Sequence, residues 1–354
     1  MRCAMRKLRN LQLSIAATSV LWLAPSHMAM AQSSSLLRLE SAGRLMIASN
    51  REIDPGSTST SAFSSRAARS LSFATVDEEN QSQNADQPIR ITVIDRADLP
   101  ALFNSLAGRA GSAQTSVLVY VHGFNNTVES ATYLAADVVN KMAFKGSVIV
   151  FAWPSRGGFL PSDYHADVAT AGASTTPIVE LLRALDGIPS VERIHVLAHS
   201  LGNDPLIKAL VGLRPAFAAR SKLGEIILCS PDIGRSEFIT LVGKSTGIVR
   251  GATLWASDSD RALKFAEALG RTNRAGLISR AGPIIMNGVD TIDVSKEAKW
   301  FEVNHNAYRQ VFGLFADLGG LLQTDRRRAW DDPDRRDNYM RMQTSRGVYW
   351  RYSE

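Results

Sequence analysis

Cysteine is nearly absent from this sequence, since Cys3 and Cys229 are the only two among its 354 residues. Cys3 belongs to the leader described below, so one thiol remains in the mature chain and a disulfide framework is excluded. Cys229 ends the apolar run 226–229, which indicates a buried, inert thiol and not a nucleophile. No cluster of Cys and His has the spacing of metal ligands. We therefore expect the protein to use neither a metal nor another cofactor.

The sequence also lacks an apolar run of the about 20 residues that cross a membrane comfortably. The mostly apolar run 11–24 is shorter; it follows four basic residues and precedes Ala29-Met30-Ala31, a small-x-small cleavage pattern. These features predict a signal peptide over residues 1–31, cleaved before Gln32. The mature chain is expected to be exported, periplasmic or extracellular, with no transmembrane span.

A large charge of one sign is missing once this leader is removed. The four basic residues of the leader reduce the formal net charge from +6 to +2, which gives no support for nucleic-acid binding. The segment 324–354 interleaves eight Arg with aromatic residues, a pattern seen in binders of single-stranded nucleic acid. Five Asp and one Glu nearly balance these Arg residues. We therefore expect a packed extension with intramolecular salt bridges.

The pattern along the mature chain divides it into three parts. Residues 32–90 are weakly patterned, with possible edge strands at 45–48 and 71–76, whereas 89–94 alternates clearly and should pair at the edge of a sheet. Residues 91–323 form the main domain, and 324–354 form the Arg/aromatic C-terminal extension.

The main domain alternates apolar strands with helical patterns from Ser116 onward, as in a parallel sheet flanked by helices. This predicts an α/β fold with a mostly parallel central sheet and helices on both faces. The expected strands include 117–121, 148–152, 194–197, 225–229, 252–256 and 289–293, and the expected helices include 128–142, 178–182, 205–211, 261–269 and 307–322.

The segment 193–204 carries the strongest functional signal. A short apolar strand ends in Ala198-His199-Ser200-Leu201-Gly202, and a helical pattern follows. A strand, a tight turn with Ser at its tip and a helix form the nucleophile elbow of α/β-hydrolases. The positions two before and two after the serine must be small, and Ala198 and Gly202 both meet this need. By itself, small-x-Ser-x-Gly is a short pattern that also occurs by chance.

A base for Ser200 can be found by elimination. In this type of hydrolase the acid and then the histidine follow the serine along the chain. Of the six histidines, His305 alone lies beyond Ser200, after the last expected strand and before the last expected helix. His305 is therefore the predicted general base.

The acid should leave a strand end between these two residues. Asp260 comes after the later strand and is our first choice, with Asp258 second and Asp232, after the preceding strand, third. Asp260 also opens a helical pattern, so a helix N-cap is a competing interpretation.

The oxyanion hole needs two backbone N–H groups. Leu201, the residue after the nucleophile, supplies one. The loop His122-Gly123-Phe124 follows an earlier strand directly and should supply the other from Phe124. A phosphate-binding loop is the alternative for this glycine-containing turn, but the Lys-Ser/Thr of a Walker motif is missing.

Together these segments resemble a bacterial α/β-hydrolase family of unknown function, whose members share Tyr-Val-His-Gly-Phe-Asn, Trp-Pro-Ser and Ala-His-Ser-x-Gly-Asn. Here they are residues 120–125, 153–155 and 198–203. Segments around Asp232, Asp260 and His305 are also similar, so the resemblance covers about residues 115–320. It implies the α/β-hydrolase fold and a triad of Ser200, Asp260 and His305, and it implies no substrate.

These features favour a serine hydrolase that cleaves a carboxylic ester, of the esterase or lipase kind, through an acyl-enzyme. The expected partner is a small-molecule or lipid acyl substrate and not a nucleic acid. An amidase or thioesterase with the same triad is the first alternative. The second is a non-catalytic envelope protein that uses a hydrolase fold for binding.

Overall fold

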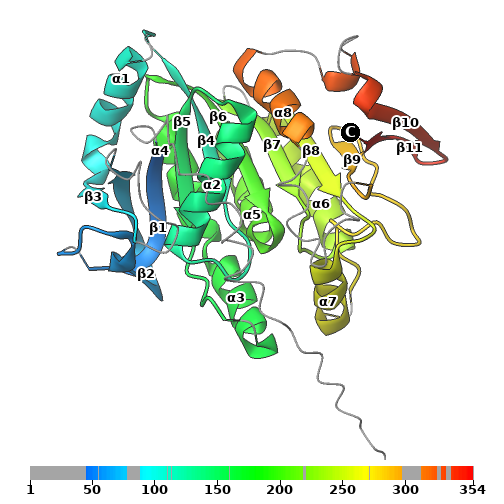
Figure 1. Cartoon of the computed structure of the whole chain (residues 1–354), viewed down its shortest axis with the longest axis horizontal. Helices are drawn as coiled ribbons and strands as arrows, with labels where there is room; N and C mark the ends of the chain where they lie inside the picture. Colours follow the sequence, from blue (N-terminus) through cyan, green and yellow to red (C-terminus); the bar gives the residue numbers. More distant parts are fainter. Residues whose placement is uncertain are drawn as a thin grey trace, which may run out of the picture. The chain divides into compact units, whose positions relative to one another are not determined.

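A mostly parallel sheet forms the centre of the described part of the protein, in the order β10-β11-β9-β8-β7-β6-β4-β5-β1-β2-β3 (Figure 1). The computed structural model describes residues 45–77, 88–296, 312–324, 328–331 and 336–353, apart from 55, 110, 113, 159, 218–220 and 271. The predicted signal peptide and His305 lie outside the described residues.

The centre of the sheet consists of six neighbouring strands, all paired in parallel. They are β4 (Thr115–Val121), β5 (Ser147–Ala152), β6 (Val191–His199), β7 (Leu223–Cys229), β8 (Gly251–Ala256) and β9 (Asp290–Asp293). Nearly every residue of β4 to β8 is buried, because helices cover both faces of a parallel sheet. The predicted α/β architecture is confirmed.

The weakly patterned N-terminal part supplies strands to this same sheet. β1 (Leu45–Ile53) pairs in parallel with β5 and antiparallel with β2 (Phe63–Val76), so it lies inside the sheet and not at an edge. β3 (Ile91–Ile94) pairs with β2 and ends the sheet. The expected edge position of 89–94 agrees with this pairing. The segments 45–48 and 71–76, expected as possible edge strands, both lie inside the sheet, because a short apolar run does not reveal which strands lie beside it.

Two hydrophobic cores lie on the two faces of the sheet. Helices α1 (Leu99–Arg109), α4 (Thr175–Asp186), α5 (Asn203–Phe217) and α6 (Arg235–Ser245) contribute to one core. Helices α2 (Val128–Met142) and α8 (Phe312–Thr324) contribute to the other, and Figure 1 shows them side by side over the near face. The predicted helix 128–142 matches α2, which starts at a capping box between Thr127 and Ser130.

Two further helices follow the carboxyl ends of strands, at the lower side of Figure 1. α3 (Pro161–Ala173) comes after β5, and α7 (Arg261–Gly270) comes after β8. In open α/β sheets the carboxyl edge of the parallel strands carries the ligand sites. Both helices are therefore placed where they can contribute to a site.

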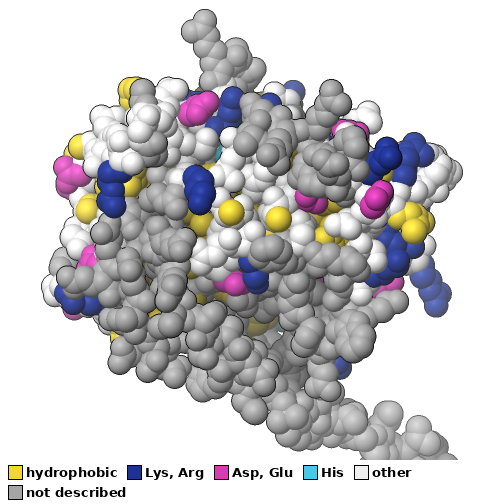
Figure 2. Space-filling model, turned by 45° about the horizontal axis from the view of Figure 1, so that its top comes forward, with side chains coloured by type: hydrophobic (Ala, Val, Ile, Leu, Met, Phe, Trp, Pro, Cys, Tyr) yellow, Lys and Arg dark blue, Asp and Glu magenta, His cyan; other side chains and the backbone are white. Residues whose placement is uncertain are grey.

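The C-terminal extension continues the sheet on its other side. β10 (Tyr339–Thr344) and β11 (Gly347–Tyr352) form a hairpin, and β11 pairs in parallel with β9. Arg351 Nε lies 2.9 Å from Asp293 Oδ2, and Arg328 Nη2 lies 2.8 Å from Glu225 Oε2. The expected intramolecular salt bridges are therefore present. Figure 2 shows Lys, Arg and acidic side chains mixed at the right of the view, where this hairpin lies in Figure 1.

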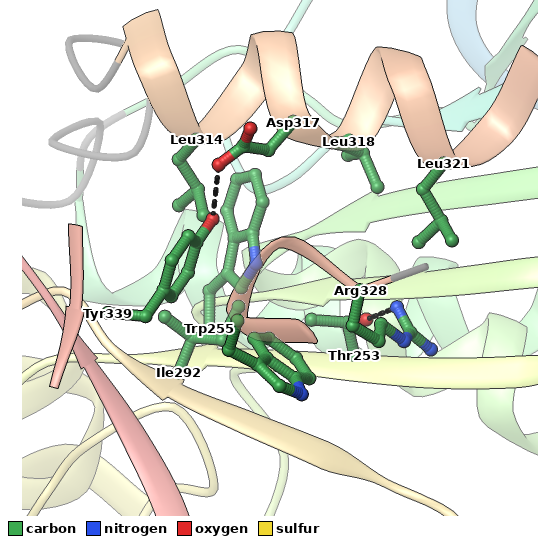
Figure 3. A pocket seen from close by; sticks show the side chains of 10 residues that line it. Thr253, Trp255, Ile292, Leu314, Asp317, Leu318, Leu321, Arg328 and Tyr339 are labelled. Carbon is green, nitrogen blue, oxygen red and sulfur yellow. Dashed lines mark hydrogen bonds between the residues drawn. The ribbon is translucent and has the colours of Figure 1, made fainter. Parts of the chain in front are cut away.

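Aromatic side chains of the extension pack beneath α8. The Tyr339 hydroxyl donates to Asp317 on α8 (2.9 Å), and both residues line a small cavity of about 30 Å³ (Figure 3). The rings of Trp330 and Trp350 stack with centroids 4.8 Å apart. The extension is thus part of the folded protein.

Among the described residues, no helix combines the length and the apolar character that crossing a bilayer requires.

Candidate active site

Ser200 lies at a strained turn between β6 and α5. Its φ is +53°, in the left-handed region that residues other than glycine and asparagine seldom adopt. Asn203 fastens the turn, since its Nδ2 donates to the carbonyl oxygens of Ser200 (2.9 Å) and Cys229 (3.2 Å). Such strain persists only where the surroundings fix it, and it is typical of functional positions. The geometry is that of a nucleophile elbow.

The small residues of the elbow have a steric cause. A Cβ on Gly202 would come within 2.3 Å of the His122 carbonyl oxygen, a distance that no side chain can adopt. Ala198 is fully buried in β6, so its methyl group fits beside the turn. The sequence pattern around Ser200 therefore reflects close contact between the elbow and the loop that follows β4.

That loop, residues 122–126, lies directly against Ser200. A Cβ on Gly123 would be 2.8 Å from Ser200 Cβ. The Gly123 carbonyl oxygen accepts a hydrogen bond from Asn126 Nδ2 (3.3 Å). A trans peptide directs its N–H away from its carbonyl oxygen, so the Phe124 N–H points away from the Asn126 side chain. The predicted donor loop and the predicted nucleophile thus meet.

His122 is a structural residue at the base of this loop. Its ring stacks on Trp153 at 4.8 Å, and its Nδ1 and Nε2 face the carbonyl oxygens of Gly123 (2.8 Å) and Trp153 (3.1 Å). Burial, with the charge of Arg51, lowers the pKa of His122 to about 3. The ring is therefore neutral at pH 7 and donates to one of the two oxygens at a time.

The three acid candidates have different surroundings. Asp258 is exposed. Asp260 is fully buried at the start of α7, and its Oδ1 accepts from the Leu263 N–H (2.9 Å), so the helix N-cap interpretation is correct for this oxygen. Asp232 is buried too, but Tyr164 donates to its Oδ2 (2.9 Å) and Arg274 Nε lies 3.2 Å from its Oδ1.

Asp232 is therefore bound to Tyr164 through one oxygen, and its other oxygen lies beside the Arg274 cation. The choice of Asp260 over Asp232 as the partner of an imidazole stays a prediction. His305 lies between β9 and α8 in the chain and outside the described residues, so its distance to Ser200 and Asp260 stays a prediction.

Sequence reasoning missed several buried polar residues around the loop 122–126. Tyr164 and Asp167 on α3, Ser155 after β5 and Arg51 on β1 all contact the loop or its supports. Ser155 was visible as part of Trp-Pro-Ser, and Tyr164 and Asp167 as polar residues three apart on one helix face. Arg51 gave no signal, because nothing near it in the sequence marks a contact with residue 126.

Cys229 behaves as the sequence predicts. It is fully buried at the end of β7, and burial raises the pKa of its thiol well above the ordinary value. A thiol in that state is not a nucleophile.

Comparison with known proteins agrees with the fold. A family model described as alpha/beta hydrolase of unknown function (DUF900) matches residues 104–318, more than half of the chain. No curated protein matches significantly.

Solved structures show only distant likeness. A structure titled "Structure of arylesterase" is similar at 11% identity over 59% of this chain and 76% of that chain, with a TM-score of 0.32. Phospholipase PlaB from Legionella pneumophila is similar at 12% identity over 68% of each chain, with a TM-score of 0.33. An esterase from Pyrobaculum calidifontis is similar at 12% identity over 67% of this chain and 82% of that chain, with a TM-score of 0.27.

Proposed function

The chain belongs to the family of alpha/beta hydrolases of unknown function, and from this premise we propose that it is a serine hydrolase that cleaves a carboxylic ester. Ser200 is the nucleophile, His305 the base and Asp260 the acid, with the N–H groups of Phe124 and Leu201 as the oxyanion hole. The observation that carries the proposal is the strained, buried Ser200 held directly against Gly123.

The proposed reaction has two stages. In the first, His305 removes the Ser200 hydroxyl proton as Oγ attacks the acyl carbon, and the alcohol leaves with that proton. In the second, His305 activates water, which releases the acid from Ser200. Asp260 orients the imidazole and stabilises its charged form, and the two backbone N–H groups stabilise the oxyanion of each stage.

A fluorophosphonate probe tests the nucleophile. We expect an adduct on Ser200 that is absent in Ser200→Ala and lost in His305→Ala. Ser230→Ala is a matched control, because Ser230 is also buried, follows the neighbouring strand β7 and has φ +43°. His165→Ala, at an exposed histidine of α3, is the control for His305→Ala. An unlabelled folded protein contradicts the proposal and favours a binding role.

The ester specificity needs a separate measurement. A series of p-nitrophenyl esters of increasing acyl length distinguishes an esterase from a lipase, and matched anilides and thioesters test the two related activities. Faster turnover of an anilide or a thioester than of the matched ester contradicts ester hydrolysis while it leaves the triad in place.

The location is part of the proposal as well. The features of residues 1–31 support export, with a mature chain that begins at Gln32. N-terminal sequencing of protein from the periplasmic and extracellular fractions tests this, and an uncleaved chain in the cytoplasm contradicts it.

A further inference from the structure

Helix α3 carries a fully buried carboxylate, Asp167, that sequence and mechanism leave unexplained. Its Oδ2 accepts from the Ser155 hydroxyl (2.5 Å) and its Oδ1 from the Arg156 N–H (2.9 Å). The Asn125 N–H also donates to this carboxylate. Burying a carboxylate costs several kcal/mol unless donors surround it. The donors here come from two loops, the one after β4 and the one after β5.

A chain of hydrogen bonds extends from Asp167 through the loop 122–126. The Ser155 hydroxyl that donates to Asp167 accepts in turn from the Asn126 N–H (3.3 Å). The Asn126 side chain donates from Nδ2 to the carbonyl oxygens of Gly123 (3.3 Å) and Phe124 (3.0 Å). The carbonyl and N–H groups of this loop are therefore fixed from the side of α3.

Strand β1 holds the same loop from another side. Arg51 is buried, and its Nη2 donates to the Asn126 carbonyl oxygen (2.9 Å) while its Nη1 donates to the Ser64 carbonyl oxygen (3.1 Å). Burial lowers the pKa of Arg51 to about 10, and the charge of Asp167 acts against this. Arg51 thus remains charged at pH 7 and balances the buried carboxylate.

A second residue of α3, one turn earlier on the same face, contacts both parts of the site. The Tyr164 ring packs edge-on against Phe124, with centroids 5.6 Å apart. Its hydroxyl donates to Asp232, whose backbone N–H donates to the Ser200 carbonyl oxygen (3.1 Å). Residues three apart on a helix lie on one face, so α3 presents Tyr164 and Asp167 to the site together.

We propose that Asp167 is a positioning residue that, with Ser155 and Tyr164, aims the Phe124 N–H at the oxyanion. This inference rests on the proposed serine-hydrolase function. Oxyanion donors act at about 2.7–3.1 Å from the developing charge, and a displacement of about 1 Å costs on the order of 10² in rate. The helix therefore sets the turnover rate without touching the substrate.

Asp167→Asn is the direct test, because an amide of the same size places an NH₂ group among donors. In the mature protein we expect kcat for a p-nitrophenyl ester to fall about 10²-fold, with KM changed less than threefold. The inhibition constant of a trifluoromethyl ketone, which forms an oxyanion on Ser200, should rise in proportion to the loss of kcat/KM. Ser155→Ala should act in the same direction, and the double variant should lose much less than the product of the two losses.

Asp317→Asn is the matched control. This carboxylate on α8 accepts from Tyr339 of the C-terminal extension, and its change should leave kcat and the inhibition constant as in the wild type. If Asp167→Asn does not fold, Ser155→Ala and Tyr164→Phe, which keep the carboxylate, give the same test. If Ser155→Ala or Tyr164→Phe folds and keeps the wild-type kcat, the proposal is overturned.

Hydrogen exchange separates this inference from the proposed function. Amide exchange over residues 123–126 should be at least tenfold faster in Asp167→Asn than in the wild type or in Asp317→Asn. A wild-type protein that neither reacts with a fluorophosphonate nor hydrolyses esters contradicts the hydrolase, and the exchange rates still decide whether Asp167 holds the loop. Unchanged exchange in a folded Asp167→Asn variant overturns the positioning role itself.

Discussion

Gly123 and Ser200 are so close that a Cβ on Gly123 would lie 2.8 Å from Ser200 Cβ. The two residues are far apart in the chain, on the loops that follow β4 and β6, and these strands are neighbours in the sheet. Parallel pairing therefore brings the predicted oxyanion loop and the predicted nucleophile to the same edge of the sheet.

Gly123→Ala should slow ester hydrolysis strongly. The added methyl group meets Ser200 Cβ and His199, so either the loop or the elbow must shift by a few tenths of an ångström or more. We expect kcat to fall on the order of 10²-fold, because both proposed oxyanion donors adjoin the contact. Gly108→Ala on α1, where a Cβ meets nothing within 4 Å, should keep wild-type kcat. Equal kcat in the two variants contradicts the close contact.

Asp260→Asn separates the capping role of this residue from its proposed catalytic role. Asn caps helices as well as Asp does, so the Leu263 N–H keeps its acceptor and the melting temperature should change little. An amide stabilises an imidazolium poorly, and we expect kcat to fall by about 10³–10⁴-fold. Asp258→Asn should keep nearly wild-type kcat, and Asp232→Asn should lose at least tenfold less than Asp260→Asn. A larger loss in Asp232→Asn makes Asp232 the triad acid.

His122 should make the protein less stable in acid. Its pKa is about 3 in the folded state and about 6.5 in the unfolded chain. Between these values the unfolded state binds a proton that the folded state does not, so the free energy of unfolding falls as pH decreases from about 6.5 toward 3. From pH 7 to pH 4.5 this amounts to roughly 2–3 kcal/mol. Urea unfolding at both pH values measures it.

The matching variant is His122→Gln, which cannot take up this proton. Its stability should differ between pH 7 and pH 4.5 by roughly 2–3 kcal/mol less than that of the wild type. His165→Gln, at an exposed position, should keep the wild-type dependence. A His122→Gln variant with the full acid sensitivity shows that groups other than His122 cause it.

Arg328→Met should destabilise the fold while it leaves the proposed chemistry intact. Arg328 contacts Glu225 (2.8 Å), Asp290 (2.9 Å) and Thr253 (3.0 Å), which joins the C-terminal extension to the sheet. Removing it leaves the buried Glu225 carboxylate without this cation, at a cost of about 3 kcal/mol. Thermal unfolding measures the loss, and Arg341→Met, at an exposed residue of β10, is the control. Equal melting temperatures of Arg328→Met and Arg341→Met contradict the role of this salt bridge.

The sequence by itself determined the features that depend on short stretches of chain. Apolar periodicity located the central strands and most helices, because burial on one or two faces leaves a regular pattern. The elbow was visible because its turn tolerates only small residues around Ser200, and the buried, inert Cys229 followed from its apolar run. The order of residues along the chain pointed to Asp260 and His305 as triad candidates.

Tertiary structure alone decided how distant segments meet. It placed β1 inside the sheet, and it brought Arg51, Ser155 and Asp167 together around the loop 122–126. It also showed that Asp232 is held by Tyr164 and Arg274, which the spacing of the three aspartates does not reveal. The physical reason is that the periodicity of apolar residues shows only which face of its own helix or strand a residue occupies. Which side chains share a buried polar network depends instead on how the elements pack against one another.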